Sequence, residues 1–266
     1  MLTIISYSNS QILNQMPNQK SFQSKVIAFV NQKGGVGKST LATNTAAILS
    51  ENYRVVLLDT DEQGSSELWC NARDEDYAEN YKVRSFSKHY KKTVNASAVT
   101  IDLEDIATNC DIVIVDTPGR NEFVSLGVIS AANLVIIPLT PGNYSLWSSD
   151  ATMQLIQKVA AIRSEDFAAR FLLNRRDKRK VSEDMEQALK EYEIPLMKTT
   201  IGNRNIYENS SSGLSVLELA ARSASDREGQ REMRGFVEEI EGLLGINRQT
   251  GKTSRTKNDK KNTAAV

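Results

Sequence analysis

The chain has 266 residues, of which 40% are apolar and 25% are charged, and its 33 basic side chains balance 33 acidic ones. Two cysteines, Cys70 and Cys110, and one histidine, His89, are too few for a disulfide scaffold, a clustered metal site or an Fe–S cluster, and they favour a cytoplasmic location. Since no apolar run approaches the ~18 residues of a membrane-spanning helix, the composition is typical of a compact globular chain.

The charge is unevenly distributed and divides the chain into three parts. Residues 1–24 carry one charge, Lys20, in a Ser/Asn/Gln-rich run without the pattern of a secretory signal, which predicts a flexible polar extension. Residues 246–266 carry six basic side chains and one acidic one with almost nothing apolar, which predicts a disordered basic tail. Residues 25–245 then hold 26 basic and 32 acidic side chains, so DNA binding by this body requires local basic clusters.

Short β-branched runs alternate with stretches of helical period through residues 25–245. This order predicts a doubly wound, mostly parallel α/β sheet. Near-continuous apolar strands need helices on both faces of the sheet. The predicted strands are Val26–Val30, Val55–Leu58, Ile112–Val115, Leu134–Pro138, Phe171–Leu173 and Leu196–Thr200. The predicted helices are Ser39–Ser50, Glu122–Ala132, Ser145–Arg163, Ser182–Tyr192 and an amphipathic one over Ala220–Leu244.

A glycine-rich turn joins the first predicted strand to the first predicted helix. Residues 31–40 read Asn-Gln-Lys-Gly-Gly-Val-Gly-Lys-Ser-Thr, the context and composition of a phosphate-binding loop. Its glycines let successive backbone N–H groups face phosphate oxygens. Lys38 would neutralise the β- and γ-phosphates, and Ser39 would place its hydroxyl on Mg²⁺. The predicted ATP-binding residues here are Gly34, Gly35, Val36, Gly37, Lys38, Ser39 and Thr40.

Carboxylates end two later strands of the predicted sheet. Asp59 and Asp61 follow the strand Val55–Leu58, and Asp116 follows Ile112–Val115. Ligands gather at this carboxyl edge of open α/β sheets. Four apolar residues before Asp116 are typical of a strand whose acid accepts from magnesium-bound water, and the Thr-Pro-Gly that follows would form a turn sensing the γ-phosphate.

The loop departs from the ordinary phosphate-loop pattern, because Gln32 stands where the first glycine is usual and Lys33 opens the run Lys-Gly-Gly-Val-Gly-Lys-Ser-Thr. Here the chain resembles the ParA/MinD superfamily of deviant Walker-type P-loop NTPases, over roughly Val26 to Leu219. The resemblance implies ATP and Mg²⁺ as cofactors. It also implies that Lys33 is the signature lysine, which binds ATP and reaches the nucleotide of a second subunit in a sandwich dimer.

Further site residues follow from the same resemblance. Asp59 would help Ser39 and Asp116 to hold hydrated magnesium, and Asp61 is the counterpart of the acid needed for hydrolysis. A carboxylate is a weak base at pH 7, so Asp61 would orient the attacking water, and hydrolysis would be slow. Asn174 falls where the superfamily often places an adenine-contacting side chain. The implied catalytic residues are Lys33, Lys38 and Asp61.

The resemblance is strongest to short ParA-type partition ATPases that lack an N-terminal helix-turn-helix domain. It implies an ATP-dependent homodimer that binds DNA non-specifically on the nucleoid. A partner centromere-binding protein would stimulate hydrolysis during plasmid or chromosome partition. Only the 24-residue extension precedes residues 25–245, which is too short for a helix-turn-helix. The predicted DNA-binding residues are Lys178, Arg179, Lys180 and Arg204, with a merely solvated basic loop as the alternative.

Two other functions stay open. A ParA-like positioner of a protein cargo, such as a microcompartment or a chemoreceptor cluster, would use the same chemistry with a cargo-adaptor partner. A metabolic ATP-dependent enzyme would share the phosphate loop, would normally lack a lysine such as Lys33, and would act without DNA. Residues 253–266 have no apolar face, so a membrane-targeting C-terminal helix is not expected.

Overall fold

The computed structural model describes residues 24–246 except 74–82, 89, 91–94, 143–149, 165–166 and 178, so most of the predicted polar extension and basic tail lie outside the described residues. Within the described part, six strands form one sheet in the order β3-β2-β4-β1-β5-β6, and every pairing is parallel. The strands are β1 (Lys25–Phe29), β2 (Val55–Asp59), β3 (Val83–Ser87), β4 (Ile112–Asp116), β5 (Leu134–Leu139) and β6 (Ala168–Leu173).

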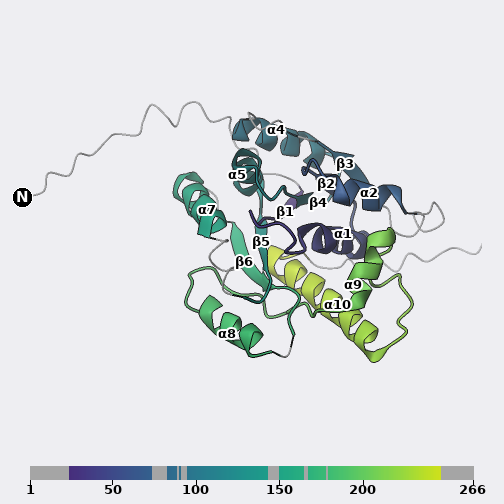
Figure 1. Ribbon diagram of the computed structural model, residues 1–266. Coiled ribbons are helices and arrows are strands. Elements are labelled where there is room, and N and C mark those ends of the chain that lie inside the picture. The colour runs from purple at the N-terminus through teal and green to yellow at the C-terminus, as the bar shows by residue number, and fades with distance from the viewer. Residues whose placement is uncertain are drawn as a thin grey trace, which may run out of the picture.

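Helices cover both faces of the sheet, as the apolar strands predict (Figure 1). Alternate residues of β1 point to opposite faces: Val26 and Ala28 belong to one core cluster, and Ile27 and Phe29 to the other. The first core is closed by α4 (Ala96–Ala107), α5 (Glu122–Ala131), α7 (Asp150–Ile162) and α8 (Lys180–Leu189). The second is closed by α1 (Lys38–Leu49), α9 (Asn205–Asn209) and α10 (Ala224–Leu244). Two short helices complete the described elements, α2 (Ser65–Asn71) and the 3₁₀ turn Ser210–Ser212.

One predicted strand is wrong. The segment Leu196–Thr200 lies beside β6, and the N–H of Met197 donates to the Phe171 carbonyl at 2.8 Å. The next two N–H groups, of Lys198 and Thr199, instead donate to the carboxylate of Glu239 on α10, at 2.8 and 2.9 Å. The backbone therefore leaves the ladder in mid-segment, and only isolated bridges remain, at Leu196 and Gly202. The sixth strand is β3, at the opposite edge of the sheet.

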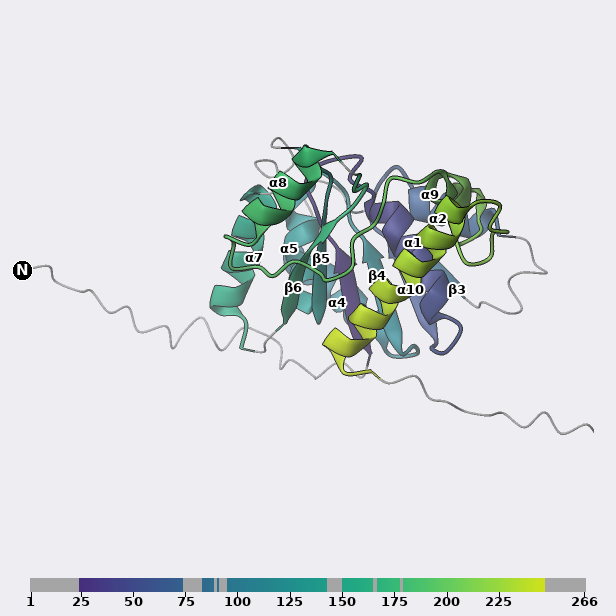
Figure 2. The same cartoon turned by 90° about the horizontal axis from the view of Figure 1, so that it is seen from below.

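The C-terminal helix starts later than its apolar pattern predicts. Ser223 forms a capping box with Asp226: its hydroxyl accepts the Asp226 N–H, and the Asp226 carboxylate accepts the Ser223 N–H. This fixes the start of α10 at Ala224 rather than Ala220. Viewed from below, α10 crosses the sheet beside α1 and reaches α9 at its N-terminal end (Figure 2). Among the described residues, no helix is both long enough and apolar enough to cross a membrane.

Candidate nucleotide-binding site

The glycine-rich loop leads from β1 into the N-terminus of α1. Gly37 is the N-cap residue, with φ 94° in the left-handed region that favours glycine. A Cβ at this position would also stand 2.2 Å from Nδ2 of Asn174, so a larger residue fits neither the backbone nor the neighbour. No side chain caps α1, which leaves the N–H groups of its first turn directed at the loop. Such a helix start is a ready anion site.

Two lysines of the loop lie close together at its base. Lys38 is buried, and its Nζ donates to the Lys33 carbonyl oxygen at 3.2 Å. Burial lowers the pKa of Lys38, and the charges of Asp116 and Asp61 act in the opposite direction. The N–H of Lys33 donates to Oδ1 of Asn31 at 2.9 Å, and Nδ2 of Asn31 donates to the Pro138 carbonyl at 2.9 Å. The loop is thereby tied to β5.

Asp116 ends β4 beneath the loop and is fully buried. Its Oδ2 accepts the Ser66 hydroxyl at 2.7 Å, while its Oδ1 has no hydrogen-bond partner among the described residues. Burial raises the pKa of Asp116 to about 7, even though the hydroxyls of Ser39 and Ser66 act to lower it. A buried carboxylate oxygen without a partner costs free energy, so this atom suits a cation or a cation-bound water.

Asp59 lies next to Asp116, in register on the adjacent strand β2. Its carboxylate accepts three backbone N–H groups, from Asp61, Ser66 and Glu67, at 2.8–3.0 Å, and so holds the first turn of α2. Burial raises the pKa of Asp59, and the three N–H groups act to lower it. With these donors in place, Asp59 is better suited to contact a hydrated ion through water than directly.

The donor set fits Mg²⁺ rather than a transition metal. No group of three or more His, Cys, Asp or Glu side chains within the described ranges could hold a metal ion. Two carboxylates and the Ser39 hydroxyl match an ion that keeps several waters and takes further ligands from phosphates. The unpartnered Oδ1 of Asp116 is the structural observation that supports this fit.

The remaining motif residues lie around the same loop. Asp61 is half-buried after β2, and its Oδ1 accepts the Gln63 N–H at 3.1 Å. The hydroxyl of Thr117 donates to the Phe29 carbonyl at 2.7 Å. A Cβ on Gly119 would stand 3.7 Å from Nζ of Lys38, so the Thr-Pro-Gly turn lies against the loop. Three motifs that are far apart in the sequence thus meet at one edge of the sheet.

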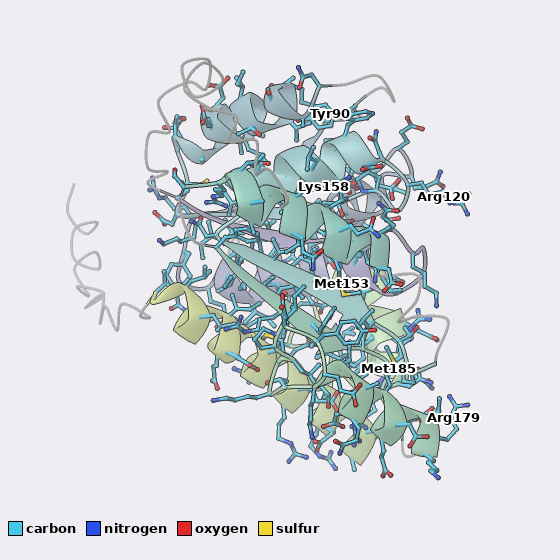
Figure 3. The ribbon with its side chains drawn as sticks, turned by 90° about the vertical axis from the view of Figure 1, so that its left-hand side faces the viewer. Tyr90, Arg120, Met153, Lys158, Arg179 and Met185 are labelled. Carbon is cyan, nitrogen blue, oxygen red and sulfur yellow. The ribbon has the colours of Figure 1, made fainter. Side chains whose placement is uncertain are left out.

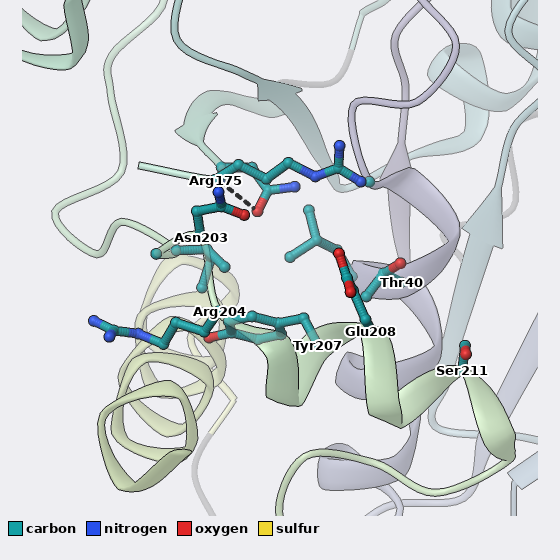
Figure 4. A pocket seen from close by; sticks show the side chains of 12 residues that line it. Thr40, Arg175, Asn203, Arg204, Tyr207, Glu208 and Ser211 are labelled. Atoms are coloured by element: carbon teal, nitrogen blue, oxygen red, sulfur yellow. Dashed lines mark hydrogen bonds between the residues drawn. The ribbon is translucent and has the colours of Figure 1, made fainter. Parts of the chain in front are cut away.

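A pocket of about 270 Å³ opens beside the loop (Figure 4). Its lining combines Gly37 and Thr40 with the segment that follows β6 and with residues 201–211. Sequence reasoning did not predict residues 201–211 as part of the pocket, because no motif marks them, and it assigned Arg204 to DNA binding instead. The lining side chains outside the loop and α1 include those of Asn174, Arg175, Ile201, Asn203, Arg204, Tyr207, Glu208 and Ser211.

Asn174 borders this pocket, where the resemblance places it. Its Nδ2 donates to the Val36 carbonyl at 2.7 Å, and its Oδ1 accepts the N–H of Arg175 at 2.9 Å. Arg175 has a positive φ of 54°, rare for a residue with a side chain. The Nδ2 end of the Asn174 amide therefore fastens this side of the pocket to the phosphate loop, and the Oδ1 end holds the backbone of the next residue. The contact of Asn174 with a base stays a prediction.

The predicted DNA-binding residues do not form one cluster of unpaired cations. Arg179 is 75% exposed at the outer end of α8 (Figure 3), and its Nε donates to Asp177 at 2.6 Å. Lys180, the first residue of α8, is exposed, and Lys178 lies outside the described residues. Arg204 lines the pocket and binds Glu232 of α10, with Nη2 2.6 Å from Oε1.

Comparison with known proteins places this geometry in context. Residues 27–216 match the family described as the CobQ/CobB/MinD/ParA nucleotide-binding domain. Two curated relatives are called maintenance of carboxysome distribution protein A. The one from Halothiobacillus neapolitanus is 28% identical over 79% of this chain and 93% of its own length. The one from Gloeobacter kilaueensis is 30% identical over 82% and 94%.

A solved structure has the same fold. It is described as a putative plasmid partition protein from Borrelia burgdorferi bound to AMPPNP. It superposes with a TM-score of 0.61 at 19% identity, over 82% of this chain and all of the other.

Proposed function

We propose that this chain, which belongs to the CobQ/CobB/MinD/ParA nucleotide-binding family, is a ParA-type ATPase that positions a cargo on DNA through a partner protein. Binding of ATP and Mg²⁺ would form a sandwich homodimer, the dimer would bind DNA non-specifically, and slow hydrolysis would reset it. The observation that carries the proposal is the uncapped start of α1 above a buried carboxylate with an unpartnered oxygen.

Each part of the nucleotide has a matching part of the site. The triphosphate would lie on residues 33–40, where backbone N–H groups and the buried Lys38 offset its charge. The nucleoside would occupy the pocket of about 270 Å³, because Gly37 and Thr40 belong both to that pocket and to the loop region. Mg²⁺, when bound, neutralises charge that develops on the β- and γ-phosphates, and Ser39, Asp59 and Asp116 would hold it.

Hydrolysis requires a water in line with the γ-phosphate. Asp61 follows Asp59 by two residues. Unlike Asp59, its carboxylate accepts the Gln63 N–H and not an N–H group of α2, so we assign Asp61 to orienting this water. Lys33 would contact the phosphates of the nucleotide bound to the second subunit. The dimer would therefore form when a γ-phosphate is present and separate when it is lost. A site without a strong general base fits slow turnover, which suits a timing switch.

DNA binding is the output of the proposed switch. Arg179 and Lys180 are both exposed at the start of α8, and neither lines the pocket, so a duplex can approach them there. Lys178 and Arg204 remain part of the predicted DNA-binding set. Two copies of this exposed start of α8 in an ATP-bound dimer would raise avidity without new contacts within either subunit.

Two cargos fit this chemistry. Plasmid or chromosome partition is the first, with a centromere-binding partner. A protein cargo with an adaptor partner is the second, and it is favoured by relatives that match this chain over 93% and 94% of their length and are named for carboxysome distribution. The similarity to the Borrelia partition protein is at 19% identity and supports the fold alone.

One experiment tests the shared part of the proposal. The purified chain is sedimented with Mg·ATP, Mg·ADP and no nucleotide, each with and without random-sequence duplex DNA. We expect a dimer with Mg·ATP and a monomer in the other two conditions. Only the ATP-bound dimer should associate with DNA. A metabolic enzyme would instead keep the same oligomeric state in all three conditions and would ignore the DNA.

A further inference from the structure

One carboxylate of α10 holds the outer wall of the pocket. Glu232 accepts hydrogen bonds from three residues of the wall: the N–H of Gly202 at 3.0 Å, Nη2 of Arg204 at 2.6 Å and the hydroxyl of Tyr207 at 2.9 Å. The Glu232 side chain is 14% exposed and that of Arg204 23%. Charge-assisted bonds that are largely shielded from water are stronger than those of a surface ion pair.

The backbone of α10 approaches the same wall without an intervening side chain. Gly229 lies one turn before Glu232, and a Cβ on it would stand 2.7 Å from Cγ2 of Ile206. The hydroxyl oxygen of Tyr207 also lies 3.0 Å from the Gly229 carbonyl oxygen, so its single proton is shared between this carbonyl and the carboxylate of Glu232. Burial raises the pKa of Tyr207, and the charge of Glu232 raises it further, so the phenol keeps its proton and remains a donor.

The directions of the Arg204 and Thr40 side chains distinguish a residue that supports the pocket wall from one that faces the ligand. In Figure 4 the Arg204 side chain runs from the pocket toward α10, whereas Thr40 approaches the pocket from α1 on the opposite side. Arg204 is therefore bound to its support rather than offered to the pocket interior. Glu232 itself is not part of the lining, so it acts on the pocket only through the residues that it holds.

A second carboxylate on α10 provides a natural comparison. Glu239, seven residues after Glu232, accepts the N–H groups of Lys198 and Thr199 at 2.8 and 2.9 Å. It belongs to the same helix and makes the same kind of bond, but neither partner lines the pocket. If a carboxylate acts only by attaching this segment to α10, substitution of Glu232 and substitution of Glu239 should change stability and ligand affinity alike.

We propose that Glu232 is a positioning residue for the nucleoside: it fixes Gly202, Arg204 and Tyr207 in the geometry that accepts the base and ribose of a nucleoside triphosphate. This inference rests on the proposed function. The phosphate loop is held by bonds that do not involve Glu232: Nδ2 of Asn31 donates to the Pro138 carbonyl of β5, and Nδ2 of Asn174 donates to the Val36 carbonyl. Loss of Glu232 should therefore move the nucleoside wall and leave the phosphate site in place.

The test compares two ligands that share phosphates and differ in the nucleoside. Binding of Mg·ATP and of magnesium tripolyphosphate to the full chain is measured by calorimetry for wild type, Glu232→Gln and Glu239→Gln. Glu232→Gln should weaken ATP binding about tenfold and leave tripolyphosphate binding unchanged, the size expected for losing charge-assisted hydrogen bonds. Glu239→Gln should leave both affinities unchanged, even where its melting temperature falls by as much as that of Glu232→Gln.

A milder variant covers the case in which Glu232→Gln does not fold. Tyr207→Phe removes the hydroxyl that donates to Glu232 and leaves the charge of the chain unchanged. We expect the affinity for ATP to fall about threefold and the affinity for tripolyphosphate to stay the same. Equal losses for ATP and tripolyphosphate, or wild-type ATP affinity in the folded variants, would overturn the role of Glu232 while the proposed function stands. Failure of the wild-type chain to bind either ligand would overturn both.

Discussion

The two halves of the candidate site are built in different ways. The phosphate half consists of residues 31–40 and the ends of β2 and β4, all close to the sheet and marked by short sequence motifs. The nucleoside half consists of a segment around residues 201–208 that α10 holds by side-chain to backbone bonds. The first half is determined by local sequence and the second by tertiary contacts, so the two should fail separately when they are mutated.

The largest expected effect is in the phosphate half. Lys38→Ala removes the buried cation that offsets phosphate charge, and we expect loss of both Mg·ATP and tripolyphosphate binding, by at least about a hundredfold. Calorimetry measures it, with Lys158→Ala as a control, because Lys158 is 62% exposed and pairs with Glu122 on the surface. Retention of tripolyphosphate binding would end the assignment of the loop.

Lys33→Gln should separate two functions of the phosphate half, nucleotide binding and dimerisation. Its charge is proposed to act on the partner's nucleotide, so the variant should keep measurable ATP affinity and lose ATP-dependent dimerisation. Sedimentation with ATP and with ADP measures this. An undiminished ATP-dependent dimer would make Lys33 a loop residue without a role across the interface.

Asp61→Ala should affect turnover and not binding. Removing the group that orients water should slow hydrolysis by about a hundredfold, because positioned acid–base groups contribute effects of that order. Phosphate release measures the rate, and calorimetry confirms that ATP still binds. Glu62→Ala, the next acidic residue along the chain, is the control. Normal turnover in Asp61→Ala would move the catalytic role to another residue.

The same division explains what could be predicted from the sequence. The phosphate loop, Asp59, Asp61 and Asp116 are recognisable because each stands in a contiguous motif at a strand end. The nucleoside wall is not, since Glu232 lies 30 residues from Gly202 and no local pattern joins them. The wrong strand at Leu196–Thr200 has the same origin: its apolar pattern predicts a ladder, and a carboxylate from α10 takes two of its N–H groups. The strand β3 escaped prediction because three of its five residues, Val-Arg-Ser-Phe-Ser, are polar, whereas the equally short β2 and β4 are apolar up to their final aspartate.

Arg179 tests whether DNA binding is separate from both halves. Arg179→Glu should weaken binding of random-sequence DNA and lower the salt slope by about one phosphate contact, without a change in ATP affinity. Arg54→Glu is a matched control, because Arg54 is also exposed, at 70%, and also pairs with an aspartate, Asp111. Equal loss in both variants would indicate a non-specific effect of charge.

Arg204 behaves differently in this comparison, because it belongs to the wall that Glu232 holds. Arg204→Glu would place two carboxylates together and should reduce ATP affinity along with DNA binding. For this reason the two arginines have to be changed one at a time. A loss of DNA binding with full ATP affinity in Arg204→Glu would return Arg204 to the DNA surface and weaken its role in the wall.

The last expected effect is on stability and concerns the buried acid under the loop. Asp116 has a pKa of about 7, far above the ordinary value of 3.8, because it is buried. Between these two values the folded chain binds more protons than the unfolded one, so this group's contribution to stability falls as pH rises from about 4 to 7.

Asp116→Asn stays neutral throughout this range. Without nucleotide, the variant's stability relative to wild type should rise with pH, by at most ~1.4 kcal/mol per pH unit, and level off above pH 7. Thermal melts of both proteins from pH 5 to 8 measure it. A constant difference across this range would mean that Asp116 is already ionised at pH 5.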